Sequence, residues 1–221
     1  MTVNTPSDLV EAKVNRRGFL FGAAGLAGAG VLVAACGSDN ENTADSGDTG
    51  GDADNKADAS GDAAVATFAA GLEVLAVNTY KGALDAATAG KLGAVPPAVA
   101  TFVTTAMKHH QEHLDAWNGA ITKGGGEAVT EPDATLNPVV AEKFGKVKDV
   151  GGAARLALEL EEIAAATYLS ALAGIKNKDS RKLAASIQAI DAKHAAILHF
   201  VLAEYPVPDV FAKTDKAAKP A

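Results

Sequence analysis

Six side chains that can ligate a metal lie within apolar stretches of the sequence: Glu73, His110, His113, Glu161, Asp191 and His194. Side chains three residues apart, such as His110 and His113, lie on the same side of a helix. A buried carboxylate without a partner is costly, whereas carboxylates and imidazoles lining one core can neutralise each other through a metal ion. As a set, these residues therefore predict a metal site.

An internal repeat places two of these residues in matching surroundings. The segments 72–84 and 160–172 are identical at seven of thirteen positions, and each contains a glutamate followed seven residues later by a tyrosine. At helical spacing, that glutamate and tyrosine share a face. We therefore expect Tyr80 and Tyr168 beside the site, either as hydrogen-bond partners of the ligands or as core residues with satisfied hydroxyls.

The elements that must position these residues are helices rich in alanine. Gly90, the Pro96-Pro97 pair, the three glycines from Gly124 and Pro206 mark their ends. The expected helices span 62–89, 96–123, 152–177 and 179–204. Short loops join the first two and the last two, and short loops make antiparallel neighbours. The sequence thus predicts an all-α fold in which two antiparallel helical hairpins are joined by a long crossover, which we expect to be irregular.

On these residues the chain resembles the ferritin-like four-helix bundles. Those bundles carry one glutamate on each of the first and third helices and a Glu-x-x-His pair on the second and fourth, and they bind two iron or manganese ions. Glu73 and Glu161 match the single glutamates, and His113 and His194 match the two histidines. The resemblance covers nearly all of residues 64–205 and implies a ferritin-like bundle there.

The chain departs from that pattern at two positions. His110 and Asp191 stand where the resemblance has the two bridging glutamates, and a neutral imidazole cannot bridge two metals as a carboxylate does. One ion, a different metal such as zinc or copper, or a site without metal therefore all remain open. His109 and His113 are a further pair that a rotated helix could present instead.

Three functions follow from these observations. The first is binding of a transition metal in the core of the bundle, with catalysis left open. The second is a metal-free structural or interaction bundle with a degenerate site. The third is a di-metal oxidase that handles oxygen or peroxide. The sequence does not decide whether copies of the chain assemble into a homo-oligomer.

The N-terminal segment has the layout of an export signal. Arg16 and Arg17 precede a mildly apolar run that ends at Ala35, and Cys36 follows directly. The paired arginines indicate twin-arginine export, and Val33 to Cys36 resembles the lipobox of bacterial lipoproteins. We therefore expect a signal peptide over 1–35, lipid on Cys36, and anchoring to the outer side of the cytoplasmic membrane. An uncleaved membrane anchor is the alternative.

The net charge of −7 comes from one segment of the chain. Residues 37–63 carry eight acidic residues against one lysine, so the remainder is close to neutral. This distribution argues against a nucleic-acid partner or attraction to anionic lipids. The composition of residues 36–63 predicts a disordered linker, and residues 206–221 are expected to form a C-terminal tail.

Overall fold

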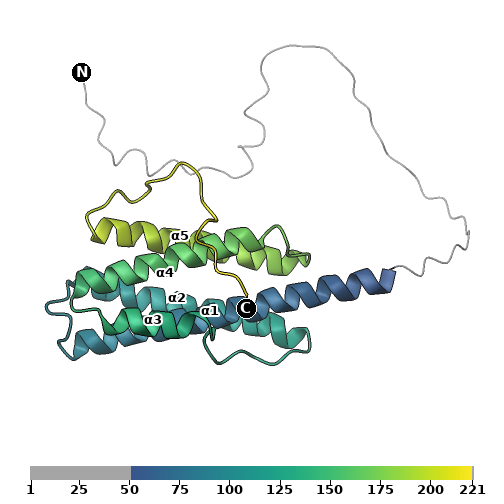
Figure 1. The fold of residues 1–221 in the computed structure, drawn as a ribbon, viewed down its shortest axis with the longest axis horizontal. Helices are drawn as coiled ribbons and strands as arrows, with labels where there is room; N and C mark the ends of the chain where they lie inside the picture. The colour runs from purple at the N-terminus through teal and green to yellow at the C-terminus, as the bar shows by residue number, and fades with distance from the viewer. Residues whose placement is uncertain (1–50, 221) are drawn as a thin grey trace, which may run out of the picture. The chain divides into compact units, whose positions relative to one another are not determined.

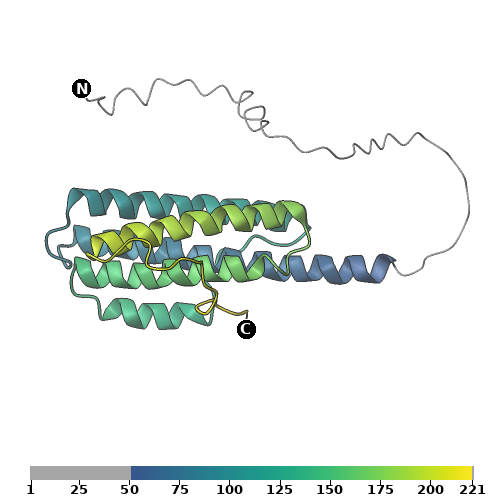
Figure 2. The ribbon, with the colours of Figure 1, turned by 90° about the horizontal axis from the view of Figure 1, so that it is seen from above.

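The computed structural model describes residues 51–220, which contain five helices and no strand. The helices are α1 (Gly51–Thr88), α2 (Pro97–Lys123), α3 (Leu136–Gly145), α4 (Val150–Ala171) and α5 (Lys178–Val201). The hairpins α1–α2 and α4–α5 pack together as a bundle (Figures 1 and 2). This confirms the predicted all-α fold of two hairpins. The segment 1–35, including Arg16 and Arg17, lies outside the described residues, as does Cys36.

Three helices begin where local chemistry sets their start. Pro97 is the first residue of α2, where a proline costs no helical hydrogen bond. The side chain of Asp149 accepts a hydrogen bond from the Gly152 amide at the start of α4, and Asn177 caps α5 in the same manner. Gly90 follows α1 with a φ of 71°, a conformation that favours glycine.

α1 begins earlier than predicted. It starts at Gly51, so residues 51–61, which were expected to belong to the linker, are helical. The initial part of α1 extends beyond the other helices in Figure 1. At the edge of the bundle, Asp62 accepts hydrogen bonds from the amides of Lys176 and Asn177, at 2.8 and 2.5 Å. These bonds tie α1 to the α4–α5 loop.

The long connection between the hairpins was predicted to be irregular. It instead contains a helix, α3. Pro138 lies in the first turn of this helix, where its missing N–H has no helical partner to lose. Just before the helix, the side chain of Asp133 accepts hydrogen bonds from the amides of Thr135 and Leu136. The Asp133 amide in turn donates to the Gly71 carbonyl at 3.1 Å, which fixes the crossover against α1.

The apolar core forms two clusters along the bundle. One contains Trp117, Ile175 and Ile187, and the other contains Leu158 and Leu198. The six predicted ligands come from the middle of the helices, between the residues of these clusters. The candidate ligand residues therefore have apolar side chains on both sides along the bundle.

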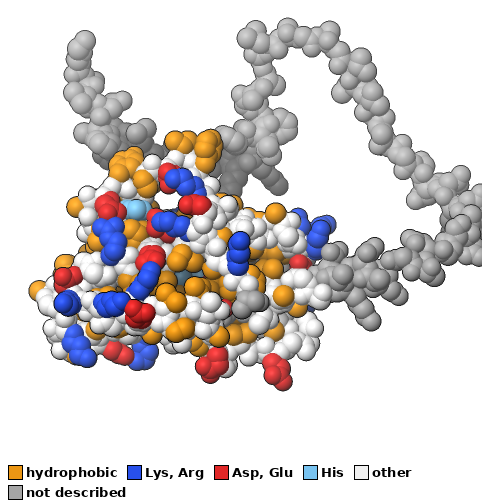
Figure 3. Space-filling model, viewed as in Figure 1, with side chains coloured by type: hydrophobic (Ala, Val, Ile, Leu, Met, Phe, Trp, Pro, Cys, Tyr) orange, Lys and Arg blue, Asp and Glu red, His pale blue; other side chains and the backbone are white. Residues whose placement is uncertain are grey.

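Three further features, in α1, in the C-terminal tail and on the surface, complete the fold. By length and composition, Ser60–Thr88 of α1 could cross a membrane, but this helix packs against α2 and contributes core residues. The C-terminal tail runs back over the second hairpin, where the Ala218 amide donates to the hydroxyl of Thr167 at 2.8 Å. Basic and acidic side chains are intermixed on the face shown in Figure 3.

Candidate metal centre

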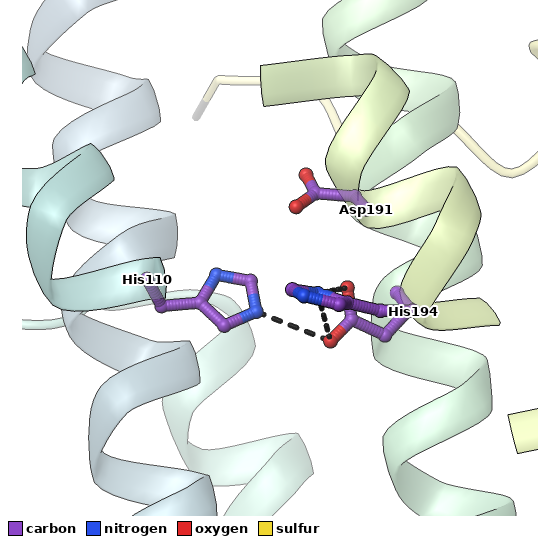
Figure 4. Close-up of side chains that lie close together, drawn as sticks. His110, Asp191 and His194 are labelled. Carbon is purple, nitrogen blue, oxygen red and sulfur yellow. Dashed lines mark hydrogen bonds and ion pairs between the residues drawn. The ribbon is translucent and has the colours of Figure 1, made fainter. Parts of the chain in front are cut away.

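The bundle brings all six predicted ligand residues to one place. Glu73 comes from α1, His110 and His113 from α2, Glu161 from α4, and Asp191 and His194 from α5. Because all six residues lie on helices, their spacing in the sequence was enough to predict that they face the core. Five of these residues are buried, and His113 is partly buried. Figure 4 shows the side chains of His110, Asp191 and His194 pointing toward one another.

His110 lies between the two glutamates. Its Nδ1 is 2.7 Å from Oε2 of Glu73, and its Nε2 is 3.1 Å from Oε1 of Glu161. The second oxygen of Glu161 is 3.3 Å from Nδ1 of His194. The imidazole at the position of a bridging glutamate thus contacts both single glutamates at once.

Each tyrosine of the repeat bonds the glutamate of the other repeat. The hydroxyl of Tyr80 donates to Oε1 of Glu161, and the hydroxyl of Tyr168 donates to Oε1 of Glu73, both at 2.5 Å. Tyr168 also accepts from the indole N–H of Trp117 at 2.9 Å. The tyrosines therefore lie beside the site as hydrogen-bond partners of the glutamates, and they connect the first hairpin to the second.

Replacing Tyr168 with phenylalanine should destabilise the metal-free protein by about 1–3 kcal/mol. The change leaves the buried N–H of Trp117 without its partner and removes one bond from Glu73, and an unsatisfied buried polar group has a cost of this size. Urea unfolding in the presence of a chelator measures it. Tyr80→Phe is the matched control, because it strands no donor, and its cost should be smaller. Equal costs would contradict this reading of Trp117.

Asp191 has no hydrogen-bond partner although its side chain is completely buried. Both of its carboxyl oxygens lack one, as does Nδ1 of His113, and these are the buried side-chain atoms of the described residues for which this holds. Nδ1 of His113 is 4.0 Å from Asp191 and 3.6 Å from Glu73. Native cores leave few such atoms unpaired. The donor set therefore fits a cation that would satisfy them.

The buried charges near His110 depend on one another. Burial alone would raise the pKa of Glu161. The charge of His110, together with the hydrogen bonds that Glu161 forms with His110 and His194, outweighs burial and lowers this pKa to about 2. Burial opposes protonation of His110, yet the two glutamates raise its pKa well above the usual value. Without metal, a protonated His110 thus compensates the glutamates.

Asp191 responds in the opposite direction. Burial, together with the charges of Glu161 and Glu73, raises the pKa of Asp191 well above its ordinary value. In the metal-free protein this carboxyl group therefore holds its proton at pH values where an exposed aspartate would have lost it. Binding of a cation would require that proton to leave.

Two overlapping groups of donors could hold an ion. In one group, atoms of His110, Glu161, Asp191 and His194 all lie within 4.8 Å of one another, and in the other the same is true of Glu73, His110 and His113. His110 belongs to both groups. Every predicted ligand is thus in one group or the other.

The predicted ligand set did not include His109. Its Nδ1 is 3.0 Å from Nε2 of His194, and the two rings stack at a centroid distance of 5.2 Å. The alternative pair of His109 with His113 does not form, because His113 faces Glu73. The adjacency of His109 to His110 was a signal for it, but which neighbour it contacts depends on the packing of α5. His199 lies apart, with Nδ1 at 2.8 Å from Glu204.

Comparison with known proteins identifies a family and a solved structure of similar fold. The model of the family described as ferritin-like domain matches residues 61–204. The crystal structure of a conserved hypothetical protein, rv2844, from Mycobacterium tuberculosis is similar with a TM-score of 0.54 and 22% identity, over 70% of this chain and 99% of that chain. This likeness concerns the fold alone. None of the curated proteins matches the chain.

Proposed function

Because this chain belongs to the family of ferritin-like domains, we propose that it binds one transition-metal ion between its two helical hairpins. The ligands are Nε2 of His110 and the side chains of Glu161, Asp191 and His194. Glu73 accepts from Nδ1 of His110 and so fixes the tautomer whose Nε2 is free to ligate. Tyr80 and Tyr168 orient the two glutamates.

The unpaired carboxyl group of Asp191 is the observation that carries this proposal. A fully buried aspartate with two unsatisfied oxygens destabilises a core unless something else requires it. An ion held between this carboxylate and the nearby imidazoles would compensate its charge. A bundle that served only as a scaffold would have no use for an acidic residue at this position.

The chemistry of His110 favours one ion over two. A neutral imidazole has one nitrogen with a free lone pair, so it can ligate an ion on the side of Glu161 or on the side of Glu73, and not on both. A bridging glutamate has no such restriction. The di-metal oxidase is therefore less well supported than a single-ion site.

The donor set indicates a transition metal but does not select one among several. Two imidazoles and two carboxylates suit iron, manganese, zinc or copper. Such an ion, when bound, supplies Lewis acidity and, for iron, manganese or copper, electron transfer. The residues of this chain hold the ligand positions, exclude water through the surrounding apolar clusters, and fix the proton on Nδ1 of His110.

Metal analysis of the full chain tests the proposal. Protein purified without a metal-binding tag should contain close to one equivalent of a transition metal, and a chelator should remove it and lower the melting temperature. Two equivalents would instead support the di-metal site. Protein that contains no metal, and whose melting temperature is indifferent to added zinc, manganese or iron, would leave the metal-free bundle as the function.

We also propose that the protein is exported and anchored by lipid. The support is the order of Arg16, Arg17, the apolar run and Cys36 in the sequence. Mass spectrometry of protein extracted from membranes should identify an acylated Cys36 as the first residue. An unmodified Cys36 in protein that retains residues 1–35 would overturn this proposal.

A further inference from the structure

The bundle contains a large apolar cavity on one side of the candidate metal centre. Its volume is about 370 Å³, whereas an apolar cavity of less than half this size already binds benzene. It lies where the two hairpins meet, since residues of α1, α2, α4 and α5 all contribute to its wall. The helices within a hairpin contact each other more extensively than the hairpins do, which leaves this space between them.

α3 closes the cavity along one side. Leu136 and Phe144 of this helix line it, and α3 lies against both α1 and α4. Phe144 approaches α1 at Gly82, where an added Cβ would lie 3.4 Å from the ring. Figure 3 shows hydrophobic side chains gathered around a hollow on this face of the molecule. The crossover thus contributes an apolar wall in addition to joining the hairpins.

The wall of the cavity determines what kind of molecule it can hold. Nearly all of its lining is aliphatic or aromatic, and none of the described lining residues is Lys or Arg. The hydroxyls of Thr79 and Thr88 bond carbonyls of their own helix. The charge of His110, which also lines the cavity, is already compensated by Glu73 and Glu161. An anionic head group would therefore find no free counter-charge in the metal-free protein, and burying it unpaired would be costly. An uncharged hydrophobic molecule meets no such penalty.

One end of the cavity meets the candidate metal centre. Tyr80, His110 and Glu161 are part of its wall, and these residues also form the hydrogen-bonded group around His110. A molecule in the cavity would therefore lie beside His110 and Glu161. The opposite end is formed by Leu92 and Val95, in the turn between α1 and α2, and by Val99 at the start of α2.

We propose that this cavity binds one uncharged, chain-like aliphatic molecule, with one end beside His110 and Glu161. The binding itself rests on the cavity alone. Only the placement of that end next to a metal rests on the proposed function. If the ion is present, the aliphatic molecule is the class of compound that would be brought to it.

Titration with 1-hexanol, 1-octanol and 1-decanol tests the inference on the full chain by calorimetry. One alcohol should bind per chain, and affinity should rise by roughly fourfold for each added methylene until the cavity is full. In chelator-treated protein at pH 7, where no metal ion faces the cavity, decanoate should bind at least tenfold more weakly than 1-decanol. Absence of alcohol binding, binding that does not depend on chain length, or equal binding of decanoate would overturn the proposal.

Variants that fill the cavity locate the binding site. Ala157→Phe and the smaller change Ala100→Leu both place bulk in the lining and should weaken 1-decanol by tenfold or more. Ala116→Phe adds the same ring as Ala157→Phe at an exposed position of α2 and should change nothing. Circular dichroism identifies which variants fold. Unchanged binding in a folded cavity variant would contradict the assignment.

Running the titration with and without a chelator separates this inference from the proposed function. Binding of 1-decanol to chelator-treated protein supports the cavity even if the protein proves to hold no metal. Failure to bind in both conditions overturns the cavity inference and leaves the metal content of the protein as a separate result.

Discussion

Replacing Glu161 with glutamine should weaken binding of zinc or manganese by more than about 100-fold. Glutamine keeps the size of the side chain but removes the negative charge that is shared by His110 and His194. Changing a residue that only orients a ligand typically costs 10–100-fold in metal affinity, and Glu161 is proposed as a ligand itself. Competition with a fluorescent chelator gives the dissociation constant.

The neighbouring residue provides the control for this change. Glu162 is on the same helix, but its side chain reaches the surface, where it pairs with Lys216 at 2.5 Å. Glu162→Gln removes the same charge from the same part of the chain and should leave metal affinity unchanged. If both variants bind metal as the wild type does, Glu161 is not a ligand. If both lose it equally, the effect is one of overall charge.

Replacing Asp191 with asparagine should stabilise the metal-free protein at pH 7 by at least about 1 kcal/mol while weakening metal binding. Burial, reinforced by the charges of Glu161 and Glu73, raises the pKa of Asp191 above its unfolded value of 3.8. A difference of one in pKa corresponds to about 1.4 kcal/mol. Asparagine has nearly the same shape and no proton to lose, so it avoids that cost.

The sign of this effect depends on pH. Because the folded pKa of Asp191 is raised, the wild type loses stability as pH increases from about 3.8 toward the folded pKa. The advantage of Asp191→Asn should therefore be largest near neutral pH and shrink as pH falls toward 4. Urea unfolding with a chelator at pH 7 and at pH 4.5 measures both values. A variant that is less stable than the wild type at pH 7 would mean that the carboxyl group contributes to the metal-free fold.

Most of the fold, and the clustering of the six candidate ligand residues, could be predicted because both depend on local periodicity. Residues three or seven apart on a helix share a face whatever the helix packs against, so Glu73, Glu161 and the pairs ending in His113 and His194 could be recognised. The long crossover followed from loop lengths. These patterns can be seen in the sequence because each turn of a core helix must place a residue toward the interior.

The features that were missed depend on which helices become neighbours. The bond of Tyr80 to Glu161, and not to the glutamate of its own repeat, is set by the packing of α1 against α4. His109 contacts His194 for a similar reason. The start of α1 at Gly51 was missed because the acidic composition of this segment predicts a linker. Composition does not show which tertiary contacts form, such as the bond between Asp62 and the amide of Lys176. The cavity was not predicted because it is the space left between side chains of several helices, and no single segment of the sequence determines it.

The crossed tyrosine–glutamate bonds make each hairpin incomplete by itself, because the partners of Tyr80 and Glu73 both lie on α4. A half-length chain with this pattern could satisfy both groups only by pairing with a second copy about a two-fold axis. Two identical chains must place the same residue at equivalent positions on either side of such an axis. The duplicated chain is free of that condition and has an imidazole, His110, at one central position and a carboxyl group, Asp191, at the other. An asymmetric centre of this kind is available to two fused halves and closed to a dimer of identical ones.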